Sequence, residues 1–240
     1  MTRSTKFGKW LFCVIALAGW TVSPQSRASE SDTAELRIRI APTESGKSSA
    51  VPAVVWLEPV SGTPVLPFLP QEHYTLLQKN RMFVPHLQVI PVGAVVHFPN
   101  ADPFFHNVFS LFEGKRFDLG LYEAGSTKSV NFSREGVSYI FCNIHPEMSA
   151  VVLALSTPLY AVADANNSFF LRNIPPGDYR LHIWIEGVPL SSLEQETRRL
   201  HFVSGTVDLG QIAAPVSRTG SMSHTNKFGK AYTPDPQSIY

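Results

Sequence analysis

The segment of this 240-residue chain that says most about its fold is Phe141-Cys142-Asn143-Ile144-His145-Pro146-Glu147-Met148. It places a thiol, an imidazole and a thioether within seven residues. The alternating run Val137–Phe141 precedes it, and the apolar run Ala150–Ser156 follows it. Both runs are typical of β-strands, so the stretch is a tight loop between two strands. Such a loop can turn all three side chains toward one point.

Short alternating runs of the same kind cover most of the chain, and helical periodicity is nearly absent. The earlier runs are Leu36–Ile40, Ala53–Leu57, Leu87–Phe98, His106–Leu111 and Lys128–Phe132. Turn signals rich in Pro, Gly, Asn and Asp separate them. The series predicts an all-β chain that begins with an antiparallel Greek-key sandwich over residues 33–156.

A domain boundary near Thr157-Pro158 separates the first sandwich from a second, smaller β-sandwich that we expect over residues 157–214. Only Leu190–Arg199 could form a short helix in this unit. The place of residues 33–60 stays open, because their strands can start the first sandwich or pair with the second unit. We expect residues 215–240 to form a flexible tail, since they are polar and contain few apolar residues.

The N-terminus has the pattern of a secretory signal peptide over residues 1–28. Basic residues precede the apolar run Trp10–Trp20, and Ser26-Arg27-Ala28 offers small residues to a signal peptidase. An uncleaved anchor is the alternative, but this run falls well short of the roughly 20 residues that a spanning helix needs. We therefore expect a periplasmic or secreted protein without stable membrane insertion. Cleavage removes Cys13 and leaves Cys142 as the only cysteine.

The composition argues against several classes of function. Charged residues make up 16% of the chain, and the net charge is +1. No basic stripe with interleaved aromatic residues occurs, so we expect no nucleic-acid partner. We also find no nucleophile elbow, phosphate loop or carboxylate pair of a recognisable hydrolase, and on this ground we expect the protein not to be an enzyme.

A fourth metal ligand is needed beside Cys142, His145 and Met148. His106 is the candidate, because it opens a predicted strand directly after a loop rich in Asn, Asp and Pro. Two imidazoles and a thiolate with a weak axial Met form a type 1 copper site. Zinc prefers four strong ligands, and calcium and magnesium prefer oxygen. The sequence therefore predicts one copper ion.

The segment His106-Asn107-Val108 and the spacing from Cys142 to Met148 resemble the cupredoxins. The spacing is most similar to that of the amicyanins, and Val92–Asp102 resembles the strands that lead to their first His ligand. The resemblance covers roughly residues 78–156. It implies a plastocyanin-like Greek-key sandwich that binds blue copper.

The same resemblance implies roles for residues around the metal. The backbone N–H of Asn107 would donate a hydrogen bond to the Cys142 sulfur, and the Asn107 side chain would tie the two ligand loops together. Pro146 would support the site from beside His145. Phe105, Ile144 and Pro146 would form an apolar rim at which a redox partner docks.

The whole chain resembles bacterial plastocyanin-like proteins that carry the label methylamine utilization protein. The second unit, with Phe169–Gly187, resembles carboxypeptidase regulatory-like domains, which are small transthyretin-like sandwiches. The remaining histidines are expected not to bind metal. They are His73, His86, His97, His182, His201 and His224.

These observations lead to one expected function and two alternatives. We expect a type 1 copper protein that carries single electrons between redox partners such as a cytochrome or a dehydrogenase. The first alternative is a copper storage or delivery module. The second is a structural envelope protein in which the metal is incidental.

Overall fold

The computed structural model describes residues 33–41, 50–71, 73–111, 114–213 and 226–230. These residues confirm the all-β prediction, with one short helix among them. The expected signal peptide over residues 1–28 lies outside the described residues, as does most of the expected tail over residues 215–240. None of the described helices has the length and apolar character that crossing a membrane requires.

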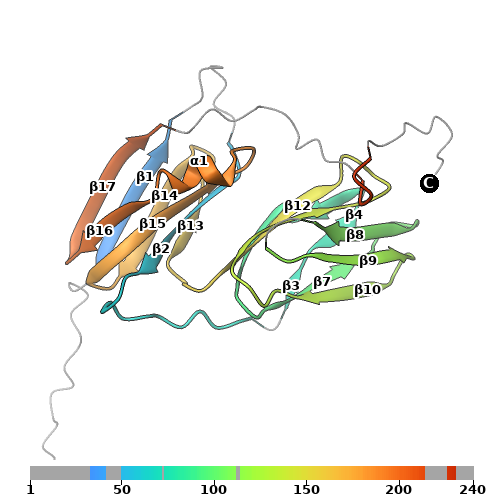
Figure 1. Cartoon of the computed structure of the whole chain (residues 1–240), viewed down its shortest axis with the longest axis horizontal. Coiled ribbons are helices and arrows are strands. Elements are labelled where there is room, and N and C mark those ends of the chain that lie inside the picture. Colours follow the sequence, from blue (N-terminus) through green and yellow to red (C-terminus); the bar gives the residue numbers. More distant parts are fainter. Residues whose placement is uncertain (1–32, 42–49, 72, 112–113, 214–225, 231–240) are drawn as a thin grey trace, which may run out of the picture.

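The first unit packs a five-stranded sheet, in the order β6-β12-β11-β8-β9, against a smaller sheet, β10-β7-β3 (Figure 1). The strands of the larger sheet are β6 (Leu87–Pro91), β8 (His106–Ser110), β9 (Phe117–Tyr122), β11 (Gly136–Phe141) and β12 (Ser149–Leu155). Those of the smaller sheet are β3 (Tyr74–Thr75), β7 (Val95–Pro99) and β10 (Thr127–Asn131). A hairpin of β4 (Leu77–Lys79) and β5 (Met82–Val84) completes the unit. Phe98, Phe132 and Ile140 lie in its core.

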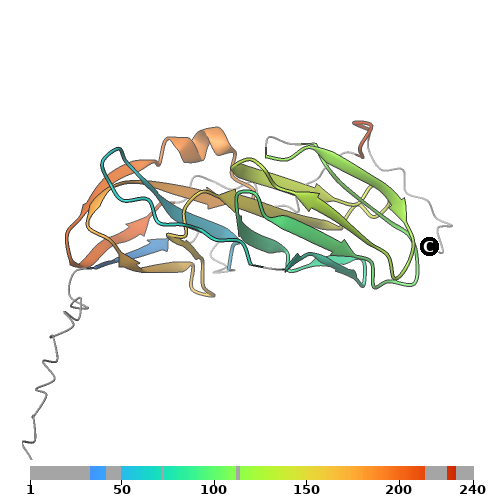
Figure 2. The ribbon, with the colours of Figure 1, turned by 90° about the horizontal axis from the view of Figure 1, so that it is seen from below.

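The second unit also has two sheets, in the orders β14-β1-β17 and β13-β2-β15-β16. The strands of the first are β1 (Ala34–Ile40), β14 (Ser168–Ile174) and β17 (Gly205–Ile212). Those of the second are β2 (Ala53–Pro59), β13 (Tyr160–Val162), β15 (Gly177–Ile185) and β16 (Arg198–Phe202). The helix α1 (Leu190–Glu194) follows β15. Figure 2 shows the two units side by side along the long axis of the molecule.

The N-terminal strands pair with the second unit. β1 lies between β14, to which it is antiparallel, and β17, to which it is parallel. β2 lies between β13 and β15. Leu36 and Ile38 of β1 are buried in the core of this unit, which is the physical reason for the placement. Of the two placements left open for residues 33–60, the strand pairing is that of the second, in which β1 and β2 complete the second unit.

The helix is shorter than the range predicted for it, Leu190–Arg199. α1 ends at Glu194, and Arg198 already pairs with Leu181 in the ladder between β15 and β16. Leu193 is the buried residue of this helix. A five-residue helix gains little from its own hydrogen bonds, so packing of Leu193 on the sheet stabilises it.

The strand β12 connects the cores of the two units. Ala150, Val152 and Ala154 point into the core of the first unit, whereas Val151, Leu153 and Leu155 belong to the hydrophobic cluster of the second. Successive side chains of a strand point to opposite faces, so both faces of β12 are buried. This burial explains why Ala150–Leu155 is a continuous apolar run instead of an alternating one. The hydrophobic cluster of the second unit therefore includes residues of β12 from the first unit.

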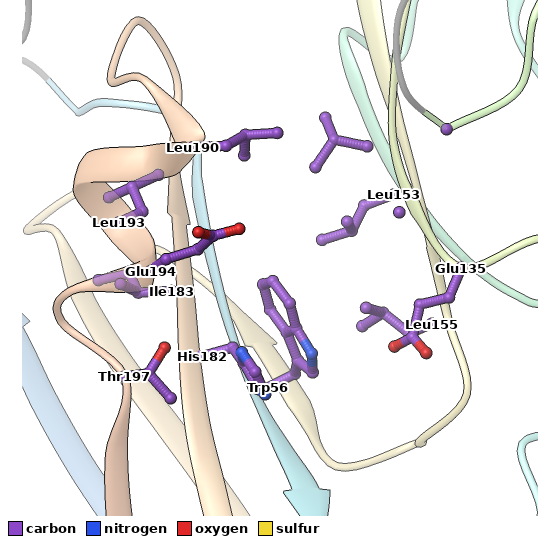
Figure 3. A pocket seen from close by; sticks show the side chains of 13 residues that line it. Trp56, Glu135, Leu153, Leu155, His182, Ile183, Leu190, Leu193, Glu194 and Thr197 are labelled. Carbon is purple, nitrogen blue, oxygen red and sulfur yellow. The ribbon is translucent and has the colours of Figure 1, made fainter.

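A pocket of about 260 Å³ lies at the junction of the two units. Its buried lining includes Val137, Leu153 and Leu155 of the first unit and Ile183 and Leu193 of the second. Figure 3 shows the Trp56 ring standing between the two sides, and Trp56 stacks on His182 with ring centroids 5.1 Å apart. The carboxylates that line the pocket belong to exposed residues, so its polar groups lie at the rim.

An ion pair also joins the units, between His86 Nε2 and Glu186 Oε1 at 2.7 Å. The hydrogen bond to Glu186 raises the pKa of His86, against the effect of burial. A raised pKa in the folded state adds stability that is full below the unfolded value of about 6.5 and is lost as the pH rises through the folded value. We expect Glu186→Gln to lower the free energy of unfolding more at a pH of about 5.5 than at about 8.5.

Chemical denaturation at both pH values measures this difference. Glu194→Gln, which changes an exposed glutamate of α1, is the control and should show the same small effect at both. An equal loss at the two pH values in Glu186→Gln would contradict the assignment.

Candidate metal centre

Three side chains with soft or borderline donor atoms, those of His106, Cys142 and His145, lie close together in the first unit. His106 is the first residue of β8, and Cys142 directly follows β11. These strands are antiparallel neighbours, with Phe109 opposite Phe141, so the start of β8 and the end of β11 lie at the same edge. His145 reaches the same point from the 142–148 loop.

Two backbone hydrogen bonds close this loop. The Cys142 N–H donates to the Met148 carbonyl at 3.1 Å, and the Met148 N–H donates to the His145 carbonyl at 3.0 Å. The ends of the loop are thereby fixed, with Met148 next to Cys142. The Met148 side chain is fully buried and packs in the same cluster as Cys142.

The distances between donor atoms fit a single ion. His106 Nδ1 lies 3.8 Å from Cys142 Sγ, His145 Nδ1 lies 3.5 Å from the same sulfur, and the two nitrogens are 3.2 Å apart. First-row ions bind imidazole nitrogen at about 2.0 Å and thiolate sulfur at about 2.3 Å. In trigonal to tetrahedral geometry these bond lengths place nitrogens about 3.3–3.5 Å apart, and nitrogen and sulfur about 3.5–3.7 Å apart. The cluster is therefore close to binding geometry.

The chemistry of the donors favours copper. Soft thiolate and thioether ligands suit Cu(I), and imidazole suits both oxidation states. His106, Cys142 and Met148 are fully buried, while His145 is partly exposed. The donor set is compatible with a copper site whose only opening to solvent is at His145.

The Cys142 sulfur lies in a pocket of backbone donors. Burial raises the pKa of the Cys142 thiol, and the N–H groups of Asn107, Ile144 and His145 donate to the sulfur and act in the opposite direction. The same donors that favour a thiolate also favour a metal-bound sulfur. An ion that binds here must displace the thiol proton.

His106 is oriented from its far side by a carboxylate. His106 Nε2 lies 2.8 Å from Asp102 Oδ2, and both residues are buried. Burial acts to raise the pKa of Asp102, but hydrogen bonds from Arg81 N–H, His106 and Asn80 N–H outweigh it and lower that pKa. This carboxylate was not among the site residues predicted from the sequence. The available signal was an acidic residue four positions before a predicted ligand.

An aromatic ring closes one side of the cluster. The Phe104 ring lies 5.2 Å from the His106 ring and 5.6 Å from the His145 ring. The Arg81 guanidinium lies over the same ring at 5.3 Å. The Phe104 ring thus packs against both imidazoles.

Asn107 differs in part from its expected role. Its backbone N–H donates to the Cys142 sulfur. Its side chain does not tie the two ligand loops together directly, and instead donates to Asp118 Oδ1 on β9 at 2.7 Å. The link to the loop is indirect, because Lys227 donates to Asp118 through Nζ and to Asn143 Oδ1 through its backbone N–H.

The described part of the expected tail, residues 226–230, therefore contacts the metal-binding end of the first unit. Its other hydrogen bonds form a compact turn around Asn226, whose side chain accepts from Phe228 and Lys230. Figure 1 shows this segment in dark red beside the 142–148 loop.

The residues expected to form a docking rim lie at the surface near His145. Phe105 is 56% exposed and Ile144 is 42% exposed. Pro146 is also exposed. A rim of this kind stays a prediction, as does the supporting role of Pro146.

The other described histidines lie apart from the cluster and have different contacts. His97 contacts Ser129 and the His73 ring. His86, His182 and His201 pair with Glu186, Glu58 and Asp178 respectively. His224 lies outside the described residues.

Comparison with known proteins gives similar structures but no family assignment. No family model matches the chain, and no curated protein matches it. A purple cupredoxin from Nitrosopumilus maritimus is 26% identical, with a TM-score of 0.31, over 34% of this chain and 96% of that chain. A reduced Cu(I) form of an amicyanin mutant is 14% identical, with a TM-score of 0.33, over 42% of this chain and 98% of that chain.

A third similar structure is the Cu-containing nitrite reductase from Thermus scotoductus SA-01. It is 25% identical, with a TM-score of 0.33, and the match covers 41% of this chain but only 25% of the reductase. The expectation that the chain is not an enzyme is withdrawn, because the similar structures include an enzyme. TM-scores this low carry no argument about function, so the proposal below relies on side-chain geometry.

Proposed function

We propose that this protein binds one type 1 copper ion and carries single electrons. The observation that supports the proposal is the buried cluster of His106 Nδ1, Cys142 Sγ and His145 Nδ1, whose atoms all lie within 4.8 Å of one another. Met148 is the proposed weak axial ligand. Copper bound there supplies a Cu(II)/Cu(I) couple.

The residues around the cluster favour transfer with little rearrangement. Cys142 and Met148 are held by the hydrogen bonds of the 142–148 loop, and His106 is held by Asp102. Fixed ligands cannot relax toward the geometry that either oxidation state prefers. A small structural change between the two states keeps the barrier to electron transfer low.

His145 is the proposed exit for the electron. It is the partly exposed ligand, and exposed apolar side chains of Phe105 and Ile144 lie near it. Small apolar contact areas suit short-lived complexes between redox proteins. We propose a redox protein, such as a cytochrome or a dehydrogenase, as partner, and the periplasm or the exterior of the cell as the location.

Protein-film voltammetry of the copper-loaded protein tests the electron-carrier proposal. We expect a reversible one-electron wave together with fast electron self-exchange between reduced and oxidised protein. Readily lost copper with slow self-exchange would contradict the proposal and would indicate copper storage or delivery instead.

A second outcome concerns the structural alternative. If the metal were incidental, copper should leave the thermal stability of the protein unchanged. A ligand that binds only the folded state raises the free energy of unfolding by about 2.7 kcal/mol at 100 times its Kd. We therefore expect a clear rise in the midpoint of thermal unfolding on loading with copper.

A further inference from the structure

A buried carboxylate lies against the nitrogen of His106 that faces away from the cluster. Asp102 Oδ2 is 2.8 Å from His106 Nε2, with side-chain exposures of 5% for Asp102 and 0% for His106. The pair is therefore shielded from water. A hydrogen bond to a charged group in such surroundings is stronger than one at the surface.

The partner atoms decide where the His106 proton lies. An ionised carboxylate can only accept hydrogen bonds, so Nε2 must carry the hydrogen. In the neutral ring this leaves a lone pair on Nδ1, which is the atom that faces Cys142 Sγ and His145 Nδ1. Asp102 thus keeps Nδ1 of His106 unprotonated and able to bind a metal ion before any ion arrives.

Asp102 is itself held by the tip of the β4–β5 hairpin. Its Oδ1 accepts from Asn80 N–H at 2.6 Å, and its Oδ2 accepts from Arg81 N–H at 2.9 Å. Both turn residues have positive φ, at 55° and 57°, as the two central residues of a type I′ hairpin turn do. The backbone N–H of Asp102 donates to Asn100 Oδ1 at 3.0 Å. The carboxylate cannot swing away from His106 without breaking these bonds.

We propose that Asp102 is a positioning residue that fixes the His106 tautomer and lowers the reduction potential of the copper. The inference rests on the proposed function. A negative charge next to one ligand stabilises the more positive oxidation state, Cu(II), more than Cu(I). The hairpin turn at Asn80 and Arg81 takes part in this effect, because its N–H groups keep the carboxylate in place.

Two variants distinguish the effect of the Asp102 charge on the copper from the effect of removing any carboxylate that is paired with a histidine. Asp102→Asn keeps an acceptor oxygen for His106 Nε2 but removes the charge. Glu58→Gln is the matched control, since it removes a carboxylate that accepts from His182 Nε2, also at 2.8 Å, in the second unit. Removing a residue that hydrogen-bonds to a metal ligand lowers the metal affinity about 10–100-fold.

We expect Asp102→Asn to lower the affinity for Cu(II) relative to Cu(I) about tenfold. For one electron this corresponds to a rise in reduction potential of about 59 mV. Voltammetry of the wild type and of both variants measures it, and Glu58→Gln should match the wild type. Equal potentials in the wild type and Asp102→Asn would overturn the redox part of the inference.

A second measurement needs no copper and uses the wild type alone. Long-range ¹H–¹⁵N NMR of the metal-free protein should show the His106 ring with its hydrogen on Nε2. A hydrogen on Nδ1 would overturn the inference, even if Asp102→Asn failed to fold. A wild type with the expected tautomer but no copper binding would overturn the proposed function and leave only the positioning role of Asp102 standing.

Discussion

Cys142→Ala, exposed to Cu(II), should lack the intense visible absorption expected of the wild type. That absorption requires a thiolate bound to copper, and Cys142 is the one cysteine among the described residues. We also expect the affinity for copper to fall by more than about 100-fold. Removing a ligand should cost more affinity than removing a residue that only hydrogen-bonds to a ligand, which costs about 10–100-fold. Absorption spectra and competition with a copper chelator measure the two effects.

The control for this variant is Met148→Leu, which keeps the volume of the axial residue and leaves the three strong donors intact. It should retain an intense band at an altered wavelength, because the axial ligand tunes the site and does not create it. An intense sulfur band that survives in Cys142→Ala would contradict the ligand assignment. Far-UV circular dichroism should show the same strand content in both variants.

Trp184→Ala should lower the free energy of unfolding by about 3–5 kcal/mol. Trp184 is fully buried in β15, and its removal leaves a cavity in the hydrophobic cluster that both units share. Its Nε1 also donates to the Tyr139 hydroxyl of the first unit at 3.3 Å. Chemical denaturation measures the change.

Phe170→Ala is the matched control for this prediction. Phe170 lies in β14 of the same unit but is 53% exposed, so its loss should stay within about 0.5 kcal/mol. Because β12 contributes to both cores, we expect the units to unfold in one transition. Two separate unfolding transitions, together with a copper absorption band that Trp184→Ala leaves unchanged, would contradict a hydrophobic cluster shared by both units.

The local part of the metal cluster was predictable from the sequence. Cys142, His145 and Met148 lie within seven residues, and the strands on both sides leave the loop little freedom. His106 could be added because a strand start after a polar loop places it at the edge of a sheet. The metal that these residues bind stays a prediction.

Contacts between residues that strand pairing brings together from distant parts of the sequence were not predictable. Asp102 reaches His106 within one loop, but its fixed position depends on N–H groups of a separate hairpin turn. The Asn107 side chain pairs with Asp118, which became its neighbour only through the register of β8 and β9. A pattern of residues shows which face of a strand is buried but not which strand lies beside it.

The N-terminal strands show the same limit. β1 has the alternation of a half-buried strand, which suits either unit. Its parallel pairing with β17, from the far end of the described chain, places it in the second unit. Such long-range pairing depends on the complementarity of whole sheets, which one segment of sequence does not reveal.

Titration of the wild-type protein with Cu(II), followed by visible absorption, tests whether Cys142 and its neighbours bind a type 1 copper ion. We expect an intense sulfur-to-copper charge-transfer band that saturates at one copper ion per chain. Weak absorption alone, of the kind given by copper bound only to nitrogen and oxygen, would contradict it.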